Sequence, residues 1–165
     1  MEVTVSSVLA NELAALLRRD LTKLCQQVKA FTDEAQLWQV LPGVENSAGN
    51  LAMHLEGNLR EYIGRQLGGL EYVRNRPVEF AGKDVPRAAL ISRLENLAET
   101  IPGVVEALSD DALAQTFPEK VLGPELSSRQ FIIHLHGHLN YHLGQIDYLR
   151  RILASGKAID YVRLP

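Results

Sequence analysis

The chain has 165 residues, a hydrophobic fraction of 46%, a charged fraction of 22% and a formal net charge of −3. These values are typical of one soluble globular domain spanning residues 1–165, and they exclude disordered and fibrous proteins. The scattered Lys and Arg residues give no reason to expect a nucleic-acid partner. The single cysteine, Cys25, excludes an intrachain disulfide and any multi-cysteine metal site. Because no signal-peptide pattern opens the chain and no apolar run approaches ~20 residues, we expect a cytoplasmic protein without membrane contact.

Apolar residues at helical spacing predict two long amphipathic helices in the first half of the chain. The first runs from Ser7 to about Phe31. The second begins after a cap at Asn46 or Ser47 and ends near Leu67, where two glycines stop it. The stretch 69–86, rich in Gly, Pro, Arg and Asn, predicts a long irregular connection, and such loops often border a functional site.

The second half predicts two more helices. The third begins near Pro86 with Asp84 as a plausible cap, and Pro102-Gly103 predicts a kink or a break in it. Residues 109–123 predict a second connection with at most a short helical turn. Ser127 and Gln130 form a capping-box pattern that begins a fourth helix, which should reach Ser155. Four such helices with long connections between the second and third and between the third and fourth predict an all-α four-helix bundle.

Four of the five histidines lie in the fourth predicted helix. His134, His138 and His142 recur every four residues and share one helix stripe, whereas His136 is offset and is interpreted as surface or interface. Two imidazoles at i and i+4 can bind one metal ion, and His54 on the second helix is the candidate third ligand. Because His134 and His142 lie ~12 Å apart, they cannot share an ion. Spacing leaves open whether His54 joins the first pair, His134 with His138, or the second, His138 with His142.

Three residues are candidates for supporting such a site. Metal-bound imidazoles usually donate their other N–H to a nearby acceptor, so the histidine left over from the stripe could have this role. Asn58 and Gln145 each lie one helical turn from a candidate histidine and could accept this hydrogen bond or orient a water. Either amide could equally close a polar pocket in the core. A single histidine on an apolar stripe is also more often a hydrogen-bonded core residue than a ligand.

Two motifs resemble one known superfamily. The pattern His-x3-His-x3-His-x-Gly-Gln, which ends at Gln145, resembles the last helix of DinB/YfiT-like proteins, and residues 46–58 resemble their second helix. The resemblance implies a four-helix bundle, commonly dimeric, that holds a divalent ion such as zinc or nickel. It also implies that the ligands are His54, His138 and His142, which leaves His134 in a supporting position. Many relatives carry Arg directly after the last ligand, where this chain has Leu143.

The resemblance implies several functions. Some relatives are thiol-dependent S-transferases or isomerases, so the leading hypothesis is a metal-dependent enzyme that would use a low-molecular-weight thiol and a second small-molecule substrate. Its catalytic residues cannot be assigned from the sequence. The alternative is a non-enzymatic metal-binding module, structural or acting in a stress response, and a third hypothesis is a histidine-lined core without an ion. We also expect a homodimer, from the resemblance and from the apolar surplus of the first and fourth helices.

Overall fold

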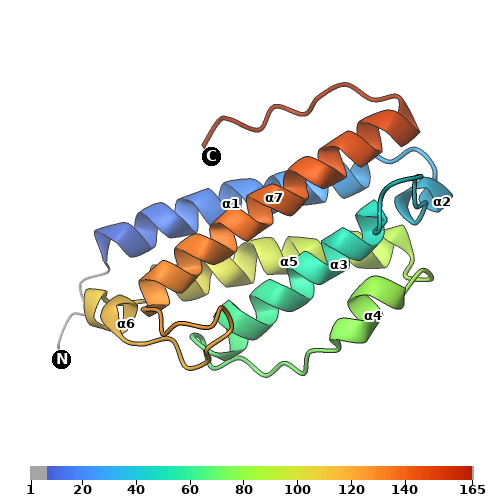
Figure 1. Ribbon diagram of the computed structural model, residues 1–165. Coiled ribbons are helices and arrows are strands. Elements are labelled where there is room, and N and C mark those ends of the chain that lie inside the picture. The colour runs from blue at the N-terminus through green and yellow to red at the C-terminus, as the bar shows by residue number, and fades with distance from the viewer. Residues whose placement is uncertain (1–6, 165) are drawn as a thin grey trace.

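A computed structural model describes residues 7–164, and within this range the chain is helical without a strand. An isolated bridge pairs Thr116 with Ser127. The prediction of an all-α protein is therefore confirmed. Figure 1 shows the long helices packed side by side, with the C-terminal segment running back along α7. No helix among the described residues is both long and apolar enough to cross a bilayer.

Four long helical segments surround the core: α1 (Val8–Lys29), α3 (Ala48–Leu59) continued by the π-helix η1 (Arg60–Arg65), α5 (Arg87–Glu106) and α7 (Ser128–Ala154). Their apolar stripes face inward and remove large aliphatic side chains from water, which is the main force that holds the helices together. Representative buried residues, two from each segment, are Leu17, Leu24, Leu55, Leu59, Leu94, Ile101, Leu139 and Ile146. This packing brings α3 alongside α7.

Three short helices lie in the connections: α2 (Glu34–Leu37), α4 (Arg76–Ala81) and α6 (Asp110–Ala114). The prediction that residues 69–86 are irregular is confirmed for 69–75 and 82–86 and is wrong for 76–81, where α4 lies. Asn75 caps α4 by accepting a hydrogen bond from the amide of Val78, and a proline follows in the first helical turn, where its missing N–H costs nothing. The short turn expected in 109–123 is α6.

The helix ends follow the predicted caps in most cases. The hydroxyl of Ser47 accepts from the amide of Asn50, and Ser127 with Gln130 forms the predicted capping box at the start of α7. Asp84 is not the cap of α5; this helix begins after Pro86 without a side-chain cap. The chain leaves α7 through Ser155, which has a left-handed backbone with φ of 52°.

Two helices differ from the prediction within their length. The helix α5 continues through Pro102 to Glu106, so the alternative of a break is wrong. Pro102 and its neighbour Ile101 are buried in the core, and this packing offsets the one backbone hydrogen bond that proline removes. In the second predicted helix the hydrogen bonding changes to the π type at Arg60, so that the amide of Gln66 donates to the carbonyl of Glu61.

Candidate metal centre

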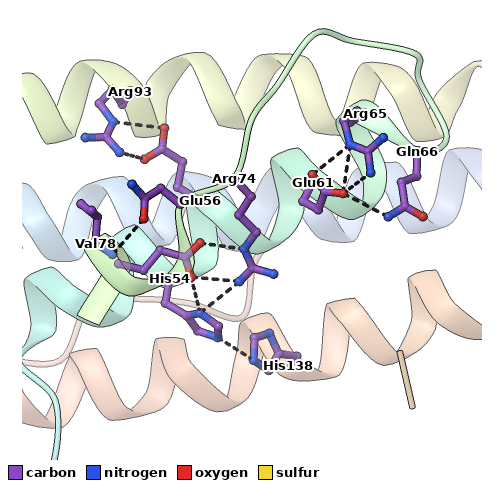
Figure 2. Close-up of polar contacts among 11 residues, drawn as sticks. His54, Glu56, Glu61, Arg65, Gln66, Arg74, Val78, Arg93 and His138 are labelled. Carbon is purple, nitrogen blue, oxygen red and sulfur yellow. Dashed lines mark hydrogen bonds and ion pairs between the residues drawn. The ribbon is translucent and has the colours of Figure 1, made fainter. Parts of the chain in front are cut away.

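The side chains of His54, His138 and His142 converge between α3 and α7. Their ligand atoms all lie within 4.8 Å of one another. Nε2 of His138 is 3.2 Å from Nε2 of His54 and 3.1 Å from Nε2 of His142. Figure 2 shows His54 and His138 facing each other from the two helices. His54 is buried, whereas His138 and His142 are half-buried, so the cluster is reached from one side.

The orientation of His54 is set by two residues that the sequence analysis missed, Arg74 and Glu79. Nδ1 of His54 lies 2.9 Å from Oε2 of Glu79. The guanidinium of Arg74 holds the same carboxylate through both oxygens, at 2.7 and 2.9 Å. Burial acts to raise the pKa of Glu79, but the hydrogen bond from His54 and the charge of Arg74 outweigh it and lower that pKa. Glu79 is therefore ionised and can only accept, so Nδ1 of His54 carries the proton.

A glycine makes room for this carboxylate. A Cβ atom at Gly57, one turn after His54 on α3, would lie 2.1 Å from Oε1 of Glu79. No side chain other than hydrogen fits there unless Glu79 moves. The sequence offers one signal for this arrangement, the Asn75 cap followed by Pro77, which marks a helix carrying Glu79.

Gln145, one of the three residues predicted to support the site, orients the ring of His142. Nδ1 of His142 donates to Oε1 of Gln145 at 2.6 Å. Burial lowers the pKa of His142, the hydrogen bond to Gln145 opposes this change, and the neighbouring His54 adds to it. The His142 ring is thus neutral near pH 7, with its proton on Nδ1 and a lone pair on Nε2.

His138 lies between the other two rings and has the most strongly shifted pKa. Burial, followed by the proximity of His142, His54 and His134, lowers the pKa of His138 to about 4. Its Nδ1 atom is buried and has no hydrogen-bond partner among the described residues. His138 is therefore neutral at physiological pH and carries a single ring proton.

The protonation states leave the cluster short of hydrogen-bond donors. His54 and His142 both place their proton on Nδ1, so their Nε2 atoms are lone pairs that face Nε2 of His138. His138 can supply at most one proton to this group. A divalent cation satisfies all three lone pairs at once, and nitrogens sharing an ion at ~2.1 Å lie about 3.0–3.4 Å apart. The two measured separations of 3.1 and 3.2 Å fit this requirement.

The other predicted supporting residues do not contact the cluster through hydrogen bonds. His134 is exposed, and its ring is nearly parallel to that of His138 at a centroid distance of 6.4 Å. It also stacks on Phe131, at 5.9 Å. Asn58 is buried, and its Oδ1 atom has no partner among the described residues. Of the three candidates, only Gln145 bonds to a cluster histidine.

His136 is half-buried and belongs to a separate polar group, so its interpretation as a surface residue is wrong. Nε2 of His136 lies 2.7 Å from Oδ2 of Asp20, a fully buried residue of α1. Asn140 donates to the same oxygen at 2.8 Å, and Arg19 binds the other oxygen of Asp20 at 2.6 Å. Burial acts to raise the pKa of Asp20, but these three hydrogen bonds outweigh it and lower that pKa. This group connects α1 to α7, and none of these hydrogen bonds involves the three clustered histidines.

A cavity of about 610 Å³ opens beside His142. One wall is the outer face of α7, and the other is formed by the connection between α2 and α3. The residues that line it are Leu41, Gly43, Val44, Glu45, Asn46, Leu51, Tyr141, His142, Gln145, Tyr148, Leu149 and Ile152. The cavity therefore gives a small molecule a path to the histidine cluster, with Gln145 at the border between the two.

Comparisons with known proteins agree with this fold. The family model described as mycothiol-S-transferase matches residues 12–155. A DinB-like protein from Bacillus subtilis has a similar structure, with a TM-score of 0.68, 12% identity and coverage of 91% of this chain and 97% of its own. A DinB-like protein from Bacillus cereus has a TM-score of 0.62 and 17% identity, and the match covers 85% of this chain and 91% of its own.

At such low identity these two structures show the fold alone. Comparison with curated proteins found no match. The family model nevertheless spans most of the chain, including all three clustered histidines. The chain belongs to the mycothiol-S-transferase family, within the DinB/YfiT-like superfamily.

Proposed function

We propose that Nε2 atoms of His54, His138 and His142 hold one divalent metal ion, and that the protein is a metal-dependent thiol S-transferase. The observation that carries the proposal is the convergence of three Nε2 atoms that share at most one proton. Imidazole nitrogens suit several divalent transition-metal ions, and the superfamily resemblance implies zinc or nickel among them. Membership of the mycothiol-S-transferase family supports the choice of reaction.

The side chains around the cluster prepare it for such an ion. Glu79 and Arg74 keep the proton of His54 on Nδ1, and Gln145 does the same for His142. A ring fixed in this tautomer pays no further cost of reorientation when its Nε2 binds. When bound, the ion would lower the pKa of a small thiol at a position left open by the three histidines, so that the thiol reacts as a thiolate at neutral pH.

The proposed reaction is a nucleophilic substitution at carbon. The thiol loses its proton to solvent, and its sulfur forms a bond to the electrophilic carbon of the second substrate. The bond from this carbon to its leaving group breaks, and the leaving group departs with the bonding electron pair. In this reaction the chain binds and orients the two reactants beside the histidine cluster, which converts a bimolecular encounter into a reaction within one complex.

Turnover measured on metal-free and reloaded protein tests the proposal. The protein is chelated, reloaded with zinc or nickel, and incubated with a panel of low-molecular-weight thiols and a chloro-substituted aromatic electrophile. We expect thioether formation and chloride release with at least one thiol, loss of both on chelation and recovery on reloading. If chelation lowers the melting temperature sharply while no thiol is turned over, the ion has a structural role and the proposed enzyme function is wrong.

We also propose that the protein forms a homodimer. Its support is the superfamily resemblance together with apolar side chains exposed on two long helices, such as Val8 on α1 and Ile133 on α7. Sedimentation at micromolar concentration should give twice the chain mass of 18.3 kDa. A species of the mass of one chain would contradict this proposal without affecting the metal site.

A further inference from the structure

The outer face of α7 beside His142 carries apolar side chains that the fold does not cover. Tyr141, Tyr148 and Ile152 are 66%, 65% and 63% exposed. Their spacing of seven and four residues places them on one side of the helix, together with Gln145. A contiguous group of exposed apolar side chains, unlike a scattered one, is typical of a surface that binds a ligand or a partner.

These residues form one wall of the cavity that opens at His142. The facing wall includes Leu41 and Val44 of the connection before α3, and Leu51 of α3 itself. A volume of about 610 Å³ lies within the range of small-molecule sites. Mostly apolar walls with a few polar groups at one end are also typical of such sites. The cavity thus suits a compact organic ligand better than a segment of another protein.

The charges around the cavity restrict the class of ligand. Among residues 7–164, no Lys or Arg lines it, and Glu45 is the one lining residue with a formal charge. In the metal-free protein an anionic ligand would meet no Lys or Arg among these lining residues and would face the carboxylate of Glu45. The guanidinium of Arg151 lies outside this lining, over the Tyr148 ring at 5.4 Å. The side-chain carbonyl of Gln145 already accepts from His142, and within the described part of the chain its Nε2 amide has no acceptor, so it can donate to a ligand.

We propose that this cavity binds an uncharged, apolar small molecule, aromatic or aliphatic. This molecule carries an acceptor group that accepts a hydrogen bond from the Nε2 amide of Gln145. The continuity of the cavity with His142 makes this molecule the electrophilic substrate, a role that rests on the proposed function. The binding preference itself is a property of the cavity walls, and it is therefore measured on the metal-free protein.

A matched pair of fluorescent probes tests the ligand class. N-Phenyl-1-naphthylamine is neutral, and 8-anilino-1-naphthalenesulfonate has the same ring system with one sulfonate. Titration of the full-length, metal-free protein should show the neutral probe binding at least tenfold more tightly than the sulfonate. Equal affinities, or tighter binding of the sulfonate, would overturn the proposal of an uncharged ligand.

Two isoleucines on α7 form a matched pair for locating the probe. Ile152 lines the cavity, whereas Ile133 is 51% exposed on the same helix outside it. Ile152→Ala should weaken binding of the neutral probe about three- to tenfold, from the loss of apolar contact area. Tyr148→Ala should do the same, and Ile133→Ala should have no effect. Equal effects of Ile152→Ala and Ile133→Ala would contradict the assignment to this cavity.

Two further measurements separate this proposal from the others. In a His138→Ala variant that has lost its metal, the neutral probe should still bind within about threefold of wild type. Retained probe binding without any thiol turnover would leave the cavity assignment standing while the proposed enzyme function fails. If Ile152→Ala instead dissociates a dimer and leaves probe binding unchanged, the face is a subunit interface and the cavity proposal is wrong.

Discussion

Glu79 lies 2.9 Å from Nδ1 of His54 and decides which nitrogen of that ring carries the proton. Because Arg74 pairs with both oxygens of Glu79, the carboxylate stays ionised and accepts the hydrogen bond. The consequence lies on the other side of the ring, where Nε2 of His54 presents a lone pair toward His138. A residue of the connection before α5 thereby prepares a candidate ligand on α3.

Replacement of this carboxylate should weaken metal binding. Glu79→Gln removes the charge that holds Arg74 and fixes the His54 tautomer, so we expect zinc affinity to fall by about tenfold to a hundredfold. Competition with a chromophoric chelator measures the change. Glu56→Gln is the matched control, because Glu56 is also a buried carboxylate, bonded to Arg60 and not to the histidines. Equal losses in the two variants would show that Glu79 has no specific role.

The space provided by Gly57 gives a second test. Gly57→Ala places a methyl group 2.1 Å from Oε1 of Glu79 and must displace it, so both the melting temperature and the zinc affinity should fall. At Gly137, in the middle of α7, an added Cβ meets nothing within 4 Å. Gly137→Ala should therefore stabilise the helix by about 0.5–1 kcal/mol and leave zinc affinity unchanged. A Gly57→Ala protein with full stability and affinity would contradict the assigned packing.

His136 and His138 should separate stability from metal binding, although they are two residues apart. His136→Ala removes a partner of the buried Asp20 and should cost about 1–3 kcal/mol of unfolding free energy, measured by urea denaturation of the metal-free protein. It should leave metal content unchanged. His138→Ala should lose the bound metal, without a comparable loss of unfolding free energy in the metal-free protein. Metal loss in His136→Ala would mean that the two polar groups are coupled.

The metal-free protein should lose stability as the pH falls from 6.5 toward 4. The pKa of His138 is about 4 in the folded chain against an ordinary value of 6.5. The unfolded state therefore binds this proton first, and the free energy of unfolding decreases with decreasing pH across that window. Denaturant titrations between pH 7 and 4.5 measure the slope, which should be shallower in His138→Ala. An identical slope in the variant would contradict the lowered pKa.

Cys25 should be unreactive in the native protein. Burial, helped by the nearby charge of Glu95, raises the pKa of its thiol to about 11. Only about 0.1% of the thiol is then ionised at pH 8, and the thiolate is the reactive form. A disulfide-forming thiol reagent should modify Cys25 slowly until denaturant is added. Rapid modification of the folded protein would contradict its burial.

The sequence predicted the parts of the site that repeat along a helix. The spacing of His134, His138 and His142 indicated a shared stripe, and the superfamily resemblance selected the last two. Spacing alone could not choose between the pairs, because the choice depends on where His54 lies along α7 once the helices pack. In the folded chain His54 faces His138 and His142, and His134 is left exposed one turn away.

The residues that support His54 could not be predicted in the same way. The Asn75 cap and Pro77 indicate a helix start, which would have located α4. They do not indicate that Glu79 reaches His54, because that contact depends on how the connection folds back over α3 and on the space at Gly57. The π-type turn at residues 60–65 likewise has no signal in the periodicity of its apolar residues.

The metal content of four purified proteins tests the central claim most directly. Wild type, His54→Ala, His138→Ala and His134→Ala are expressed identically, loaded with zinc, desalted and analysed by elemental mass spectrometry. The wild type and the His134→Ala protein should each contain about one divalent ion per chain, and the His54→Ala and His138→Ala proteins should contain almost none. Full metal content in His138→Ala, or its loss in His134→Ala alone, would contradict the proposed site.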